Sequence, residues 1–153
     1  MIRGISFRIK QEKNILWKIL KCINVKKYNW YNVEDQSEAW HFTDDFKEEP
    51  FFKSSIYNGE DFASLIRRSH SIIFLKMEAY EENPKRFDIQ SYEEFQKSSC
   101  KMLLLIYDCE FVEIYAKDQE IIDSIYENAY SNKFTDVRYI CDANDLRKIM
   151  SVL

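Results

Sequence analysis

Apolar and polar residues alternate along several segments of this chain, and the alternation predicts β-strands. Every second side chain is apolar at residues 5–9, which is the period of a strand with one buried face. Residues 71–80 follow the same period over a longer stretch. Residues 102–107 form an unbroken apolar run, which is typical of a central strand covered on both faces.

A tight turn and a set of amphipathic helices follow from the same pattern. Asp108 and Cys109 separate the apolar run from residues 111–116, so these two strands are expected to fold back on each other as a hairpin. Apolar residues recur at helical spacing in three other places, with Asn14 as the cap of the first and Asn58-Gly59 as a turn signal before the second. Ser91 and Glu94 form an S-x-x-E capping box that opens a further short helix. The predicted helices cover residues 14–23, 59–68, 91–95 and 118–130.

The helix at 118–130 separates the strand at 111–116 from a final strand at 137–141. A strand–helix–strand connection makes the two strands run in the same direction, whereas the final strand would pair antiparallel beside 102–107. The pattern leaves the order of the sheet open. Strands and helices without strict alternation favour the α+β class, with one domain over residues 1–153 and a mixed, largely antiparallel sheet on which the helices pack.

Aromatic residues are concentrated at 28–33 and 39–43, on either side of the polar run 34–37. This arrangement predicts a β-hairpin with a four-residue loop. Aromatic side chains supply a large contact area at low entropic cost, so an exposed face of this hairpin could bind a protein partner. The strand propensity of aromatic residues explains the same pattern without a partner. The candidate binding residues are Tyr28, Trp30, Tyr31, Trp40 and Phe42.

Composition supports one compact domain and argues against several classes of partner. The chain has 153 residues, 46% of them hydrophobic, and only two glycines and two prolines, so it can bury one core and has no Gly/Pro-rich linker. A net charge of −4 gives no basic excess, and we expect no nucleic-acid partner. No apolar segment is long enough for a signal peptide or a membrane span. We therefore expect a cytoplasmic location and no membrane association. The four cysteines form no C-x-x-C pair, which favours buried, reduced thiols.

Only two histidines are present, and neither lies in a catalytic or metal-binding motif. His41 follows Trp40 in a predicted strand and is interpreted as a half-exposed strand residue. His70 lies where a helix ends and a strand begins, a position that helix capping explains as well as chemistry does. The sequence therefore predicts no cofactor and gives no catalytic residue.

Carboxylates near the predicted tight turn offer one alternative. Asp108 and Glu110 are expected at one edge of the sheet, and Asp142 and Asp145 join them only if the strand order brings the last strand alongside. Oxygen ligands of this kind suit Mg²⁺ or Ca²⁺. Asp is also a common turn residue for reasons of backbone geometry, which explains the same residues without a metal.

Four segments carry a resemblance to a known family: residues 3–7, 27–30, 111–118 and 139–147. On these segments the chain resembles a family of uncharacterised small proteins from Bacillus and related Firmicutes, over nearly its whole length. The resemblance implies a bacterial, cytosolic protein and transfers no catalytic residue.

Two functional hypotheses follow from these observations. The first is a non-catalytic protein-interaction module, regulatory or toxin-neutralising, that binds through the aromatic hairpin. The alternative is a small enzyme with a carboxylate-lined site built around Asp108 and Glu110, with or without a bound metal ion. The sequence favours the non-enzymatic hypothesis and leaves the oligomeric state open.

Overall fold

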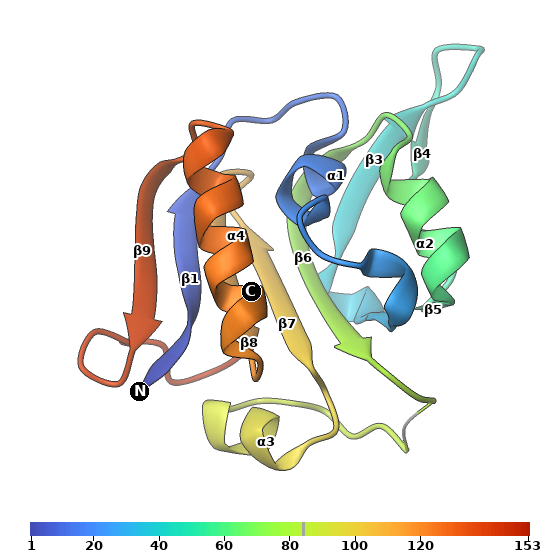
Figure 1. Cartoon of the computed structure of the whole chain (residues 1–153). Helices are drawn as coiled ribbons and strands as arrows, with labels where there is room; N and C mark the ends of the chain where they lie inside the picture. The colour runs from blue at the N-terminus through green and yellow to red at the C-terminus, as the bar shows by residue number, and fades with distance from the viewer. Residues whose placement is uncertain (84) are drawn as a thin grey trace.

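The residues that the structure describes form a nine-stranded sheet with four α-helices (Figure 1), and the α+β class is confirmed. The computed structural model describes residues 1–83 and 85–153. None of its described helices is long and apolar enough to cross a membrane. The elements are β1 (Ile2–Arg8), α1 (Ile15–Leu20), the 3-10 turn η1 (Val25–Lys27), β2 (Asn29–Asn32), the 3-10 turn η2 (Glu34–Gln36), β3 (Glu38–Phe42), β4 (Glu48–Pro50), β5 (Ile56–Tyr57), α2 (Gly59–Ile66), β6 (Ser71–Tyr80), α3 (Tyr92–Lys97), β7 (Met102–Tyr107), β8 (Phe111–Ala116), α4 (Gln119–Ser131) and β9 (Thr135–Cys141).

The main path of the sheet runs β4-β3-β6-β7-β8-β1-β9, and the pairings are antiparallel. The unbroken apolar run forms β7, between β6 and β8, as predicted for a central strand. Its residues 102–106 are buried, because both faces of the sheet are covered at this point.

The two faces of the sheet carry two separate cores. Leu104 and the other side chains of its face pack under α1, α2 and α4, which lie side by side in Figure 1. Leu103 and Leu105 point to the other face, where Phe95 of α3 and Met150 of the C-terminal segment (residues 142–153) cover them. The period-2 pattern of each strand therefore distributes its residues between a helical face and a second face that a short helix and irregular chain cover.

The crossover helix resolves the strand order that the sequence left open. α4 connects β8 to β9, and both strands pair antiparallel with β1, which lies between them. β8 and β9 therefore run in the same direction without touching, so β9 pairs with neither strand that the sequence analysis weighed. The first strand of the chain fills the position between them.

The predicted aromatic hairpin is wrong. β2 and β3 do not pair with each other: β2 pairs with residues 77–80 of β6, and β3 pairs with residues 71–74 of the same strand. β6 is ten residues long, so two short strands fit end to end along one edge of it. The polar run forms η2, and Val33 N donates to Lys76 O at 3.0 Å, which keeps the chain beside β6 instead of reversing it.

The real hairpin of this region lies further along the chain. Residues 44–55 carry little periodicity, yet Glu48–Pro50 form β4 and pair with β3, with Trp40 opposite Pro50 and Phe42 opposite Glu48. The hairpin of β3 and β4 extends beyond the helices and projects from the body of the molecule (Figure 1). β4 is an edge strand, and its proline and glutamates are residues that protect such edges from pairing with other chains.

His70 has a structural position at the start of α1. Its Nε2 accepts a hydrogen bond from Leu16 N at 3.1 Å, and its Nδ1 lies 2.7 Å from the carbonyl oxygen of Arg68. Nδ1 therefore carries the proton, and the neutral ring satisfies a free N–H of the first helical turn. Burial lowers the pKa of His70 below its ordinary value, so the ring stays neutral at physiological pH.

Candidate functional site

Two of the five aromatic candidates belong to the core of the helical face. Tyr28 and Trp30 are buried, and Trp30 stacks on Phe62 of α2 with ring centroids 4.4 Å apart. The indole Nε1 of Trp30 donates to the carbonyl oxygen of Val25 at 3.0 Å. With their faces covered and the indole N–H satisfied, these two residues stabilise the fold and leave little surface for a partner.

Tyr31 is part of a polar cluster on the second face of the sheet. The guanidinium of Arg86 lies 3.9 Å above its ring and binds both carboxylate oxygens of Glu78, at 2.8 and 3.0 Å. Glu78 is fully buried and also accepts a hydrogen bond from the hydroxyl of Tyr80. Tyr31 therefore packs against a guanidinium that neutralises a buried carboxylate, which is a structural role.

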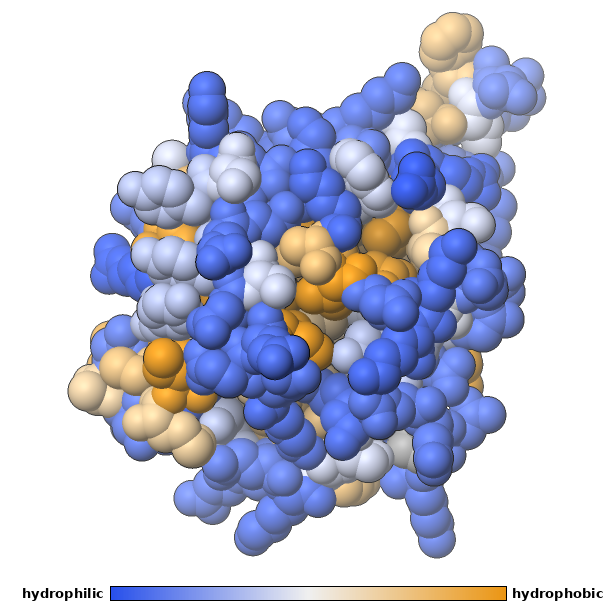
Figure 2. Space-filling model, viewed as in Figure 1, coloured by the Kyte–Doolittle hydropathy of each residue, from blue (hydrophilic) through white to orange (hydrophobic). Residues whose placement is uncertain are grey.

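The remaining two candidates lie on the projecting hairpin. Trp40 is half-buried, and Phe42 is 68% exposed. Phe46, in the loop between β3 and β4, is 89% exposed. Figure 2 shows hydrophobic surface at the end of this hairpin, beside hydrophilic side chains. The aromatic tip, defined here as Phe42 and Phe46, presents two large apolar side chains to solvent in an element that stands away from the body.

The backbone at Phe46 has a conformation that bulky residues rarely adopt. Its φ is 59°, in the left-handed region that favours glycine or asparagine and costs other residues roughly 1–2 kcal/mol. Two backbone hydrogen bonds hold the loop, Phe46 N to Thr43 O at 2.9 Å and Thr43 N to Lys47 O at 2.8 Å. The Thr43 hydroxyl accepts a third from Lys47 N at 3.2 Å. An aromatic residue that is strained and almost fully exposed contributes little to the core, and such strain is concentrated at functional positions.

Replacing Phe46 by asparagine should therefore stabilise the protein. Asparagine tolerates a positive φ, and little buried surface is lost, so the free energy of unfolding should rise by about 0.5–1 kcal/mol. Phe42→Asn is the matched control, because it makes the same chemical change in β3 where φ is not positive, and it should give no gain. Urea denaturation of the three proteins measures the difference. Equal stability of wild type and Phe46→Asn would contradict the claim that the positive φ of Phe46 destabilises the folded protein.

Carboxylates surround the aromatic tip. Residues 44–49 carry four carboxylates and one lysine, and Glu49 forms an ion pair with Lys53 at 3.3 Å and lies 3.4 Å from Nε2 of His41. Asp44, Asp45 and Glu48 form no ion pair within the described residues. The tip is therefore apolar at its centre and negatively charged around it.

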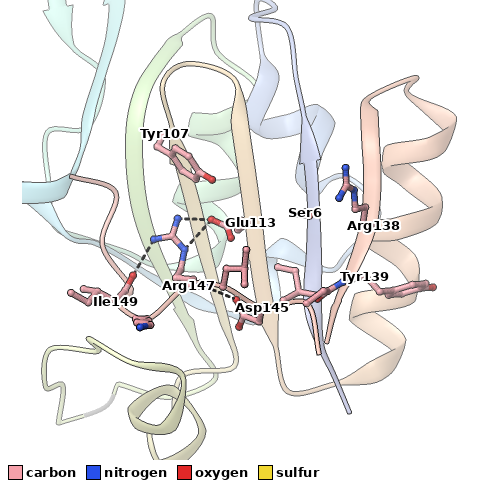
Figure 3. A pocket seen from close by; sticks show the side chains of 12 residues that line it. Ser6, Tyr107, Glu113, Arg138, Tyr139, Asp145, Arg147 and Ile149 are labelled. Atoms are coloured by element: carbon pink, nitrogen blue, oxygen red, sulfur yellow. Dashed lines mark hydrogen bonds and ion pairs between the residues drawn. The ribbon is translucent and has the colours of Figure 1, made fainter. Parts of the chain in front are cut away.

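A groove of about 400 Å³ lies on the second face of the sheet, beneath the C-terminal segment (Figure 3). Arg147 forms a two-pronged ion pair with Glu113 of β8, and its guanidinium lies 5.3 Å from the ring of Tyr107. Figure 3 shows these three side chains directed toward one another, whereas Tyr139 points away from them. Burial, together with the charge of Glu113, raises the pKa of Tyr107, so its hydroxyl keeps its proton at neutral pH.

Most charged side chains of this groove form ion pairs or hydrogen bonds with neighbouring residues of the protein. Asp145 binds Arg3 at 3.0 Å and accepts a hydrogen bond from the hydroxyl of Tyr115 at 3.1 Å. Arg147 also donates to the carbonyl oxygens of Ile149 and Ser151, at 3.0 and 2.6 Å. The bonds of Asp145 with Arg3 and Tyr115, and the ion pair of Arg147 with Glu113, attach the C-terminal segment to β1 and β8. We therefore interpret the groove as part of the contact that holds the C-terminal segment against the sheet.

The two carboxylates proposed as metal ligands lie at the β7–β8 turn. Asp108 and Cys109 both have positive φ, 52° and 62°, which is the geometry of a two-residue type I′ hairpin turn, and Asp108 is exposed. Glu110 forms an ion pair with Arg8, at the other end of β1 from the Arg3–Asp145 pair. Asp142 and Asp145 therefore do not join them. Within residues 1–83 and 85–153 no three His, Cys, Asp or Glu side chains are grouped to hold a metal ion. The cation site remains a hypothesis.

Sequence reasoning missed Phe46. Residues 44–55 show no clear period in the sequence, because a three-residue strand is too short to give one. The signal that could have found it is an aromatic residue inside a run of charged turn residues, Asp44-Asp45-Phe46-Lys47-Glu48. Neither strand packing nor turn geometry calls for phenylalanine at such a position.

Comparisons with known proteins agree with the resemblance drawn from the sequence. The model of a family described as "Protein of unknown function (DUF2691)" matches residues 2–151. A protein of Bacillus subtilis (strain 168), "Uncharacterized protein YncE", is 34% identical over 158 residues, covering 99% of this chain and 100% of that protein. No solved structure matches the chain. The resemblance to a family of small Bacillus proteins is therefore confirmed.

Proposed function

The chain belongs to the DUF2691 family, and from that premise we propose that it is a non-catalytic protein-interaction module that binds its partner through the aromatic tip of the β3–β4 hairpin. The observation that carries the proposal is Phe46, 89% exposed at a positive φ on a projecting element. The free energy gained when a partner buries this side chain would offset the backbone strain, which no contact within the described part of the chain offsets.

The chemistry of the tip indicates what the partner must offer. Phe42 and Phe46 can each fill an apolar pocket, and aromatic anchors of this kind account for much of the binding energy of protein interfaces. Asp44, Asp45 and Glu48 around them favour lysine or arginine at the rim of that pocket. The proposed partner is a protein with an apolar pocket surrounded by basic side chains.

A module of this kind acts by occupying its partner's surface, which suits a regulatory or toxin-neutralising protein. Blocking a basic, apolar site requires a stable complex and no chemical step in the module itself. We place this interaction in the cytoplasm, a location that the four free cysteines support. Burial raises the pKa of Cys22 to about 11 and that of Cys100 to about 12, so both thiols remain protonated and unreactive there.

The test is affinity capture from an extract of the source organism with three forms of the chain. Wild type should retain a partner in stoichiometric amount, and the Phe42→Ala/Phe46→Ala double variant should retain at most about a tenth as much, because it loses both anchors. Tyr130→Ala is the matched control, since Tyr130 is an aromatic residue on α4 that is 71% exposed, close to the 68% of Phe42. It should retain the partner as wild type does.

The captured protein is then purified and the complex rebuilt from the two components. Rising salt should slow the association, because the carboxylates of the tip steer a basic partner. Retention that is equal for wild type and the double variant, or lost in Tyr130→Ala, would place the interface elsewhere and reject the hairpin. Absence of any stoichiometric partner would reject the interaction module itself.

A further inference from the structure

A cavity of about 340 Å³ opens on the helical face between α1 and α2, and neither residue of the aromatic tip lines it. Its volume lies in the range of sites for small ligands. Its walls come from the end of α1, the chain that leads into η1, and the last turns of α2. The lining residues are Trp17, Lys21, Ile23, Asn24, Val25, Lys26, Ala63, Ser64, Ile66 and Arg67.

The charge of this cavity has one sign. Lys21, Lys26 and Arg67 line it, and no aspartate or glutamate is among the lining residues. Lys26 is paired with Glu60 at 3.5 Å, whereas Lys21 and Arg67 form no ion pair within the described residues. The surrounding segment 10–27 contains six lysines and one glutamate, although the whole chain has a net charge of −4. The cavity is therefore a local positive centre on an otherwise acidic protein, which attracts anions.

Two of the cations meet at one indole ring. The Nζ of Lys21 lies 5.1 Å from the ring centroid of Trp17, and the guanidinium carbon of Arg67 lies 5.5 Å from the same centroid. Lys21 donates a hydrogen bond to Asn132 at 3.2 Å, while Arg67 forms no ion pair or side-chain hydrogen bond within the described residues. Their places at the ends of α1 and α2 suit the helix dipoles. That preference does not require both cations to lie over the ring of Trp17 and to line the same cavity.

The remaining wall is apolar. Ile66 and Val25 are buried beneath the cavity, and Ile23 and Ala63 are partly buried beside it. Figure 2 shows hydrophobic surface in a hollow at the centre of the helical face, bordered by hydrophilic side chains. A ligand that fits both parts has a compact anionic group at one end and an apolar body at the other.

We propose that the cavity between α1 and α2 binds a small organic phosphate, with its phosphoryl group between Lys21 and Arg67 and its apolar portion against Ile23 and Ala63. A phosphoryl group is close to dianionic at neutral pH, so it neutralises both converging cations, which a carboxylate would not. The guanidinium of Arg67 can donate two parallel hydrogen bonds to phosphate oxygens, and Lys21 supplies a point charge. This site is separate from the hairpin, and either can exist without the other.

The probe is phenyl phosphate, titrated into the full chain by calorimetry. Wild type should bind it, and Arg67→Gln should weaken binding by at least about tenfold, because the two-pronged contact is lost. Lys97→Gln, which removes the same charge from α3 on the second face, should change the affinity less than about twofold. Failure of wild type to bind, or equal binding by Arg67→Gln, would overturn the proposal.

Three further probes test the two halves of the ligand and its source. Inorganic phosphate and benzoate should each bind more weakly than phenyl phosphate, because one lacks the apolar body and the other the second charge. If inorganic phosphate binds as tightly as phenyl phosphate, the proposed apolar contact is wrong. If benzoate does so, the proposed preference for a dianionic group is wrong. Vesicles of phosphatidylcholine and phosphatidic acid distinguish the source of the phosphate. If wild type is retained on the vesicles and Arg67→Gln is not, the site binds a lipid headgroup. If wild type binds free phenyl phosphate but is not retained, the site binds a soluble ligand.

Discussion

Replacing Leu104 by alanine should lower the free energy of unfolding by roughly 2–5 kcal/mol. Leu104 lies in the middle of β7, is 0% exposed, and packs in the core beneath the helices. β6 and β8 flank it on both sides, so the sheet cannot move to fill the space that a smaller side chain leaves.

Denaturant unfolding of the variant measures this loss, and Leu146→Ala provides the control. Leu146 is 90% exposed in the C-terminal segment, so the same truncation there should cost less than about 0.5 kcal/mol. A loss at Leu104 no larger than that at Leu146 would mean that β7 is not the central strand of the sheet.

Gly4→Ala should be at least comparably severe, at roughly 3 kcal/mol, because it forces two strands apart. A Cβ atom at Gly4 would lie 1.9 Å from the carbonyl oxygen of Ile114 and 2.8 Å from its carbonyl carbon. Both are backbone atoms of β8, which cannot move without breaking its pairing with β1. β1 also pairs with β9, so the disturbance reaches the strand that α4 positions.

Ser6→Ala is the matched control for this substitution. Ser6 lies on the same face of β1, two residues further along, and also pairs with both β8 and β9. In the same thermal or denaturant melt, Ser6→Ala should change the free energy of unfolding by less than about 0.5 kcal/mol. Tolerance of alanine at position 4 would contradict the close approach of β1 and β8 and the position of β1 between β8 and β9.

Local pattern predicted most of the elements because period and capping are local properties. The apolar run 102–107 identified the central strand, and Ser91 with Glu94 identified α3, whose N–H of Glu94 does bond to the Ser91 hydroxyl at 3.1 Å. The spacing at 118–130 identified the crossover helix. In each case burial of one face or a side-chain cap determines the element within a few residues of sequence.

Pairing partners could not be predicted in the same way, because they depend on distant parts of the chain. β2 and β3 looked like a hairpin from their sequences, but the length of β6 allows both to pair along it. The residue pattern of β1, β8 or β9 does not predict that β1 lies between the other two strands. The energy of a sheet lies in cross-strand contacts, which a single strand's pattern does not specify.

The candidate site was predicted only in part for a related reason. Aromatic enrichment selected Trp30 and Phe42 alike, although one is buried against Phe62 and the other is exposed on the hairpin. Strand propensity is the same for a core and a binding residue, so it cannot separate them. Phe46 became visible only when its exposure and positive φ were both known.

The affinity of Phe46→Asn for the purified partner tests the central claim most directly. This variant is expected to be more stable than wild type, so a loss of binding cannot be attributed to unfolding. The interaction module predicts that the dissociation constant rises by at least about tenfold, mainly through faster dissociation, because an aromatic anchor has been removed. An affinity equal to that of wild type would contradict the claim that the strain at Phe46 is maintained for binding.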